Sequence, residues 1–206
     1  MTKPVRRLVL SSNNAKKLEE LRQLLAPLGA DVVSQGELGI GEADEPHSTF
    51  LENALAKARH ASAASGLPAL ADDSGLCVDA LDGAPGVRSA RFASDAGEGE
   101  GDGANNALLL RRMDGHAERQ ARFVCALVAV RSVHDPEPLV AMGRWELQVL
   151  LAPQGIGGFG YDPIVRPAQA DHSVADCSAE EKHRHSHRGQ AMRELLGQLS
   201  AQWGWR

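Results

Sequence analysis

Residues 67–81 read LPALADDSGLCVDAL, in which Asp72 and Asp73 lie side by side between an apolar run and a Ser-Gly pair. The apolar run predicts a short buried strand that ends at the two acids, and residues 77–81 favour another strand. Buried carboxylates cost free energy unless cations or hydrogen-bond donors compensate them. We therefore expect this strand to carry both acids into a site where positive charge gathers.

The segments before this strand alternate between strand and helix patterns. Residues 6–11 are β-like, and leucines on one face of a 3.6-residue period predict a helix that ends near Pro27. Residues 30–35 favour a second strand. Thr49 and Glu52 have the spacing of a capping box, which predicts a helix running to Gly66.

The segments after residue 81 also alternate between helix and strand patterns. Residues 95–106 are rich in glycine and acid, which is typical of a mobile surface loop followed by a helix. Residues 119–132 predict a strand buried on both faces, and residues 138–151 its hairpin neighbour. A second capping box at Ser178 predicts a helix to Trp203. Irregular alternation of strands and helices indicates a mixed α/β fold.

Composition limits the class of protein. The 206 residues are 43% hydrophobic and 24% charged, with a net charge of −5, which suits one large domain or two packed lobes. Without a basic tract, binding to nucleic acid as a main task is disfavoured. We find no membrane span and no signal peptide. The isolated Cys77, Cys125 and Cys177 suggest packing residues in a reducing cytoplasm.

Four stretches carry candidate chemistry. In LSSNNAKK (10–17) a strand gives way to a helix whose N-terminus, polar side chains and lysines suit phosphate, although a plain helix cap explains them too. Asp44 or Glu45, in a loop, can join the strand acids around a hard cation such as Mg²⁺. GIGGFGYDP (155–163) matches GxGxxG but does not open a helix, so it favours a pocket for a flat heterocycle over a dinucleotide site.

The fourth stretch, EEKHRHSHRGQ (180–190), gathers Lys182, His187 and Arg188 as donors near one helix. His183 and His187 are spaced for one helix face, yet the pattern lacks the remaining ligands of a zinc site. A solvated basic face is the plain alternative.

Together these motifs resemble the Ham1-like inosine triphosphate pyrophosphatases. SSNNAKKLEEL, STFLENALAKA, ADDSGL, GAPGVRSAR, GGFGYDP and SHRGQA occur in the order of that family from Leu8 to about Leu199. The resemblance implies a long central mixed sheet flanked by helices, forming one domain over residues 1–206 with two lobes and a substrate cleft between them. It also implies a homodimer that acts on a small-molecule purine nucleoside triphosphate. Composition and cysteine usage add the expectation of a cytoplasmic protein that binds no nucleic acid and no membrane.

The implied reaction converts ITP, dITP, XTP and dXTP to the monophosphate and pyrophosphate with Mg²⁺, which keeps deaminated purines out of DNA and RNA. By match to the family, Asp73 is the general base and a metal ligand, supported by Asp72, with Lys17 and Lys57 also catalytic. Glu45 or Asp44 is the other metal ligand, and either remains possible because the loop alignment can slip by one residue. The implied substrate contacts are Ser12, Asn13, Asn14, Ala15, Lys16, Lys17, Ser74, Phe159, Gly160, Tyr161, Asp162, Lys182, His187 and Arg188.

Adjacent side chains on an extended strand point opposite ways. We therefore expect one aspartate to face metal and water, and the other to support it or to be an alternative metal contact. Two other functions stay open: a Maf-like nucleotide pyrophosphatase with another substrate preference, and a nucleotide sensor without turnover. The second is disfavoured because a sensor has no need of a metal-positioned base.

Overall fold

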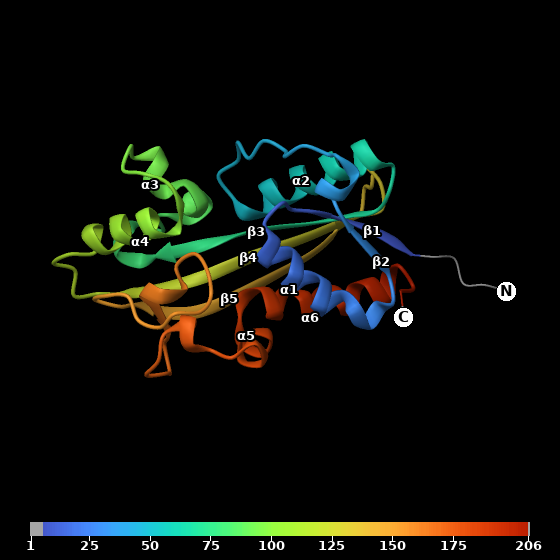
Figure 1. The fold of residues 1–206 in the computed structure, drawn as a ribbon. Helices are drawn as coiled ribbons and strands as arrows, with labels where there is room; N and C mark the ends of the chain where they lie inside the picture. The colour runs from blue at the N-terminus through green and yellow to red at the C-terminus, as the bar shows by residue number, and fades with distance from the viewer. Residues whose placement is uncertain (1–5, 206) are drawn as a thin grey trace. The chain divides into compact units, whose positions relative to one another are not determined.

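The computed structural model describes residues 6–205 and contains one mixed β-sheet (Figure 1). The strands lie in the order β2-β1-β3-β4-β5-β6, where β1 pairs in parallel with β2 and β3, and β5 pairs antiparallel with β6. The expected α/β class with a mixed sheet and flanking helices is confirmed. The strands are β1 (Arg7–Ser11), β2 (Asp31–Ser34), β3 (Ala69–Val78), β4 (Gln120–Val130), β5 (Leu139–Val149) and β6 (Val165–Pro167).

The helices follow most of the predicted segments. They are α1 (Ala15–Leu25), α2 (Phe50–Ser65), α3 (Phe92–Asp95), α4 (Gly101–Arg112), α5 (Ala179–His185) and α6 (His187–Gln202). Short 3-10 turns lie at Ala26–Leu28, Gly36–Leu38, Asp79–Leu81, Gly86–Arg91, Asp162–Ile164 and Val174–Asp176. Within residues 6–205 no helix is both long enough and apolar enough to cross a bilayer.

The chain forms two compact units. The first takes in the described residues up to Asp73, together with Ala126–Met142 and the described residues from Arg188 onward. Its core sets α2 against β1, β3 and β4 through small side chains, chiefly Ala54, Ala58, Ala61, Ala69, Ala71, Ala126 and Val128. The predicted capping box begins α2, because Thr49 Oγ1 accepts from the backbone N–H of Glu52 at 3.2 Å. Close helix–sheet packing therefore fixes α2 and β3 together.

The second unit comprises Ser74–Cys125 and Gly143–His187. Its core holds larger side chains, among them Leu76, Phe92, Leu108, Leu109, Phe123, Trp145 and Tyr161. The strands β3, β4 and β5 each contribute residues to both units.

Three predicted elements differ from the structure. The strand does not end at the acids: β3 continues through Asp72 and Asp73 to Val78, and residues 79–81 form a 3-10 turn instead of a second strand. An extended backbone can pass through the two buried acids because each of them contacts at least one cation. The expected tail helix is divided into α5 and α6 by Ser186, whose backbone is extended (φ −65°, ψ 155°). His183 and His187 therefore do not share one continuous helix.

The third difference is the glycine-rich stretch 95–106, which is not a loop throughout, since α4 begins at Gly101. Tertiary contacts overcome the low helix propensity of glycine here. Leu108 and Leu109 are buried, and the side chain of Asn105 accepts from the N–H of Ala93 at 2.8 Å while donating to the carbonyl of Ala90 at 3.2 Å.

Candidate active site

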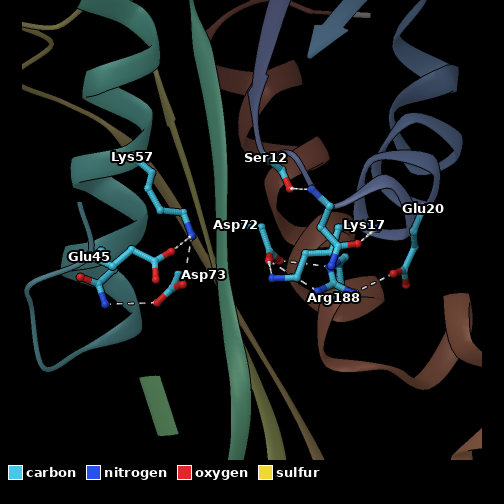
Figure 2. Close-up of polar contacts among 10 residues, drawn as sticks. Ser12, Lys17, Glu20, Glu45, Lys57, Asp72, Asp73 and Arg188 are labelled. Carbon is cyan, nitrogen blue, oxygen red and sulfur yellow. Dashed lines mark hydrogen bonds and ion pairs between the residues drawn. The ribbon is translucent and has the colours of Figure 1, made fainter. Parts of the chain in front are cut away.

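The two aspartates of β3 are both buried but face different partners. Asp72 is 2% exposed and Asp73 6% exposed. Figure 2 shows their side chains on opposite sides of the strand, with Lys17 and Arg188 on the Asp72 side and Lys57 and Glu45 on the Asp73 side. The alternation of a strand thus places the two carboxylates in separate electrostatic environments.

On the first side, Asp72 is enclosed by two cations. Lys17 Nζ donates to Asp72 Oδ1 at 2.7 Å, and Arg188 Nε donates to Oδ2 at 3.0 Å. Arg188 also donates from Nη1 to Glu20 Oε2 at 2.7 Å. Burial disfavours the charged carboxylate, but Arg188 and Lys17 outweigh it and hold the pKa of Asp72 well below its usual range. Asp72 is therefore an ionised anchor.

On the second side, Lys57 Nζ joins two acids. It donates to Glu45 Oε1 at 2.8 Å and to Asp73 Oδ1 at 3.0 Å, and Asn53 Nδ2 donates to Asp73 Oδ2 at 3.4 Å. Burial raises the pKa of Asp73; Lys57 opposes this, and the charge of Glu45 adds to it. A carboxyl group with a raised pKa accepts a proton more readily than an ordinary aspartate, which suits a general base.

The acid pair offers the oxygen ligands that a hard divalent cation prefers. The carboxylates of Asp73 and Glu45 converge on the same ammonium group, and their mutual repulsion contributes to the raised pKa of Asp73. Mg²⁺ prefers such oxygen ligands, usually one or two carboxylates with substrate phosphates and water. Asp44 is exposed, whereas Glu45 is partly buried and paired with Lys57. This arrangement favours Glu45 over Asp44 as the loop ligand.

The predicted phosphate loop, residues 12–16, joins β1 to α1. Asn14 caps the helix, since its Oδ1 accepts from the N–H of Lys17 at 3.0 Å, and its own N–H donates to Ser12 Oγ at 3.2 Å. Asn13 Nδ2 donates to Glu42 Oε1 at 3.1 Å. Ala15 and Lys16 are exposed at the helix start. The loop thus presents a capped helix N-terminus, with Lys17 directed to Asp72.

The predicted base segment, Phe159 to Asp162, lies in the second unit and is held from several elements. Tyr161 Oη donates to the carbonyl of Ser89 at 2.8 Å, and Asp162 Oδ2 accepts from the N–H of Phe159 at 2.9 Å. Gly158 has a positive φ of 75°, and a Cβ there would come within 2.3 Å of Asp162. Glycine is therefore required for this turn to close on its own carboxylate.

The donors predicted near the C-terminal helix have different partners; they are Lys182, His187 and Arg188. Lys182 Nζ donates to Asp162 Oδ2 at 2.5 Å and lies 5.5 Å from the centre of the Phe159 ring. His187 stacks on Phe123 with ring centres 4.9 Å apart. Arg188 contacts Asp72 and Glu20, which also belong to the first unit, and its role in base binding stays a prediction. Ser74 is partly exposed in β3, directly after Asp73.

Several contacts of the candidate site residues were not predicted from the sequence. Asp102 and Asn106, in the stretch expected to be a loop, lie on α4 and bond the backbone of Gly160: its N–H donates to Asp102 Oδ2 at 2.7 Å, and Asn106 Nδ2 donates to its carbonyl at 3.0 Å. Asn53 reaches Asp73 from α2. The helical spacing of Asp102 and Asn106, four residues apart, was the available signal.

Comparison with known proteins agrees with this architecture. Residues 8–198 match the family model described as the Ham1 family. A "dITP/XTP pyrophosphatase" of Leptothrix cholodnii is 58% identical, covering 96% of this chain and 98% of its own length, and one of Ralstonia nicotianae is 57% identical, covering 95% and 97%.

A solved structure also matches this chain over nearly its whole length, at a lower sequence identity. The HAM1 protein of Coxiella burnetii is 39% identical to this chain and superposes with a TM-score of 0.88, covering 95% of this chain and 99% of that one. The sequence match and the structural match both extend over nearly the whole length, and this chain belongs to the Ham1 family.

Proposed function

We propose that this protein hydrolyses the non-canonical purine nucleoside triphosphates ITP, dITP, XTP and dXTP to the monophosphate and pyrophosphate. The observation that carries the proposal is the pair of buried aspartates on β3, one ionised between Lys17 and Arg188 and the other set against Glu45 and Lys57. Family membership and the names of the relatives, "dITP/XTP pyrophosphatase", support the substrate class. The protein would thereby remove deaminated purines before polymerases use them.

In this reaction a water oxygen attacks the α-phosphorus, the bond between that phosphorus and the oxygen bridging to the β-phosphorus breaks, and pyrophosphate leaves. Asp73 takes the proton of the attacking water, a role that its raised pKa supports. Lys57 keeps the carboxyl of Asp73 oriented through its 3.0 Å bond. The N-terminus of α1 and Lys17 stabilise negative charge on the phosphates.

Glu45 and Asp73 would hold Mg²⁺, with Asp44 the less favoured alternative to Glu45. When bound, Mg²⁺ neutralises phosphate charge and polarises the phosphoryl group. Asp72 acts indirectly, because it fixes Lys17 and Arg188 beside the phosphate helix. The family resemblance further supports a homodimer working in the cytoplasm.

Recognition of the base is assigned to Phe159–Asp162, with Lys182 and His187. The Phe159 ring offers a face for a flat purine, and backbone or lysine donors suit the carbonyl at C6 of hypoxanthine and xanthine. Adenine presents an amino group at that position, and a buried donor facing a donor discriminates by ~10⁴ or more. Guanine shares the carbonyl, so its exclusion must use its 2-amino group.

A substrate panel with Mg²⁺ tests the proposal. We expect kcat/KM for dITP, ITP and XTP to exceed that for ATP, GTP and the pyrimidine triphosphates by orders of magnitude, with pyrophosphate as co-product. A preference for pyrimidine or modified nucleotides would support the Maf-like alternative, and binding without turnover would support a sensor.

The position of cleavage has its own test. Hydrolysis in ¹⁸O-labelled water should place the label in the nucleoside monophosphate, because water attacks the α-phosphorus. Label in pyrophosphate would mean attack at the β-phosphorus. Release of orthophosphate with a nucleoside diphosphate would contradict the proposed reaction altogether.

A further inference from the structure

A second group of ligand-type side chains lies outside the proposed active site. One nitrogen of His172, the sulfur of Cys177 and one carboxylate oxygen of Glu181 all lie within 4.8 Å of one another. All three residues belong to the second unit. His172 and Cys177 lie on either side of the turn Val174–Asp176, and Glu181 is in the first turn of α5. The proposed hydrolysis uses none of them.

We propose that His172, Cys177 and Glu181 bind a divalent transition-metal ion of the zinc class. Imidazole, thiolate and carboxylate are the ligands that Zn²⁺ uses in proteins. A thiolate with an imidazole selects against Mg²⁺ and Ca²⁺, which take oxygen ligands. The site therefore differs in chemistry from the carboxylates of Asp73 and Glu45.

One ligand–ligand distance is already close to that of a filled site. One ring nitrogen of His172 would bind the ion. Its Nε2 lies 3.6 Å from Glu181 Oε1, whereas the 3.9 Å contact of Cys177 Sγ is with the other ring nitrogen, Nδ1. Zinc–ligand bonds of about 2.0–2.3 Å imply roughly 3.3–3.7 Å between ligand atoms in a tetrahedral site. The Nε2–Oε1 distance falls in that range, and side-chain rotation must bring Cys177 Sγ around the same ion; the three ligand atoms already lie within 4.8 Å of one another.

The backbone holds the group in place. The N–H of Cys177 donates to the carbonyl of Val174 at 3.3 Å, and Ser178 Oγ accepts from the N–H of Glu181 at 3.1 Å, which caps α5 directly beside the group. His172 Nδ1 lies 3.2 Å from the carbonyl of Ser173. A donor bond from Nδ1 to a carbonyl is a common outer contact of metal-binding histidines, and it directs Nε2 toward Glu181 as the ligand.

An ion can reach the group from solvent, since the side chains of His172 and Glu181 are 45% and 36% exposed. Three protein ligands leave a fourth position for water. Burial, with the charge of Glu181, raises the pKa of Cys177 to about 11, so metal binding must release the thiol proton. Glu181 precedes Lys182, which bonds Asp162, so an ion here would fix the start of the helix that carries Lys182.

Cobalt binding to the chelator-stripped full-length protein tests the proposal. Co²⁺ bound by Cys177 should give a thiolate-to-metal charge-transfer band, which the sulfur-free carboxylates of Asp73 and Glu45 are unable to produce. Cys177→Ser should abolish the band. Competition between Zn²⁺ and a chromophoric chelator should show a loss of at least about tenfold in affinity for one site in Cys177→Ser and in His172→Ala, as metal-site substitutions typically cause.

Cys77→Ser and His134→Ala are the matched controls, a buried thiol and an exposed imidazole that are not among the three proposed ligands, and both should bind as the parent protein does. His172→Ala alters an exposed side chain, so it keeps the test decisive if Cys177→Ser folds poorly. Absence of the charge-transfer band in the parent protein, or unchanged zinc affinity in His172→Ala, would overturn the proposal.

Discussion

The two sides of β3 differ although their aspartates are neighbours in the chain and almost equally buried. Asp72 meets two cations, so its charge is balanced and its pKa is depressed. Asp73 shares a single lysine with Glu45, so burial prevails and its pKa is raised. Neighbouring charges, more than burial, therefore decide whether each carboxylate is a fixed anchor or a group able to exchange a proton.

The largest expected effect is on chemistry at Asp73. Asp73→Asn keeps the side chain's size but removes the proposed base and one metal charge. We expect kcat for dITP to fall by ~10²–10⁴-fold, the usual contribution of general base catalysis, with the fold retained by circular dichroism. Turnover near that of the parent protein would contradict the assignment of Asp73.

The matched substitution Asp72→Asn should act on stability. It leaves Arg188 and Lys17 facing a neutral amide in a buried position, and breaking a buried ion pair typically costs about 3 kcal/mol or more. Urea unfolding of both variants measures this effect. We expect Asp72→Asn to lose far more free energy of unfolding than Asp73→Asn, and equal losses would mean that the two sides do not differ as described.

A smaller effect is expected at the helix start. Lys17→Ala removes the cation that contacts Asp72 and, as proposed, the phosphates; we expect kcat/KM for dITP to fall about tenfold or more, as one lost charged contact would cause. Lys16→Ala is the control, because adjacent helical residues point about 100° apart. Similar losses in steady-state kinetics would show that the helix register at the phosphates is misassigned.

The smallest expected effect is on how the free energy of unfolding depends on pH, measured with a chelator present. The depressed pKa of Asp72 stabilises the fold above pH 3.8, its unperturbed value, and this contribution declines as the pH falls toward the native pKa. The raised pKa of Asp73 has the opposite sign: its contribution is present below pH 3.8 and is lost as the pH rises through the native value.

Denaturant unfolding measured across the acid pH range separates the contributions of Asp72 and Asp73. Asp72→Asn should no longer lose stability as the pH falls below 3.8. Asp73→Asn should no longer lose stability as the pH rises through the native pKa of Asp73. Each change should amount to about 1.4 kcal/mol in the free energy of unfolding per unit of pKa shift. An unaltered pH profile in both variants would show that neither carboxyl group has the described shift.

Much of the site could be predicted from local sequence because its parts depend on short-range patterns. The Thr49 capping box begins α2 as expected, and Asn14 caps α1 beside Lys17. The motif order identified the family, which the sequence and structural comparisons confirm. The roles of the individual site residues stay predictions.

Other features depend on contacts distant in sequence. Arg188 lies 116 residues from Asp72 in the chain, and no local pattern relates it to that aspartate instead of to Lys182. The helix α4 forms in a glycine-rich stretch because Asn105 bonds α3 and the preceding turn, and because buried leucines anchor its second half.

The sequence by itself determined the fold class, the family and two opposed aspartates on one strand, because strand alternation and helix caps are local properties of the backbone. The family resemblance predicted Asp73 as the base and Asp72 as its support, and only the tertiary structure gives the physical reason why the two carboxylates differ. Asp72 and Asp73 are the same residue type in the same strand, and they differ in the charged groups that other parts of the chain bring to them: Lys17 and Arg188 to Asp72, and Lys57 with Glu45 to Asp73. Electrostatic energy depends on distance in space, which the chain fixes only when it has folded.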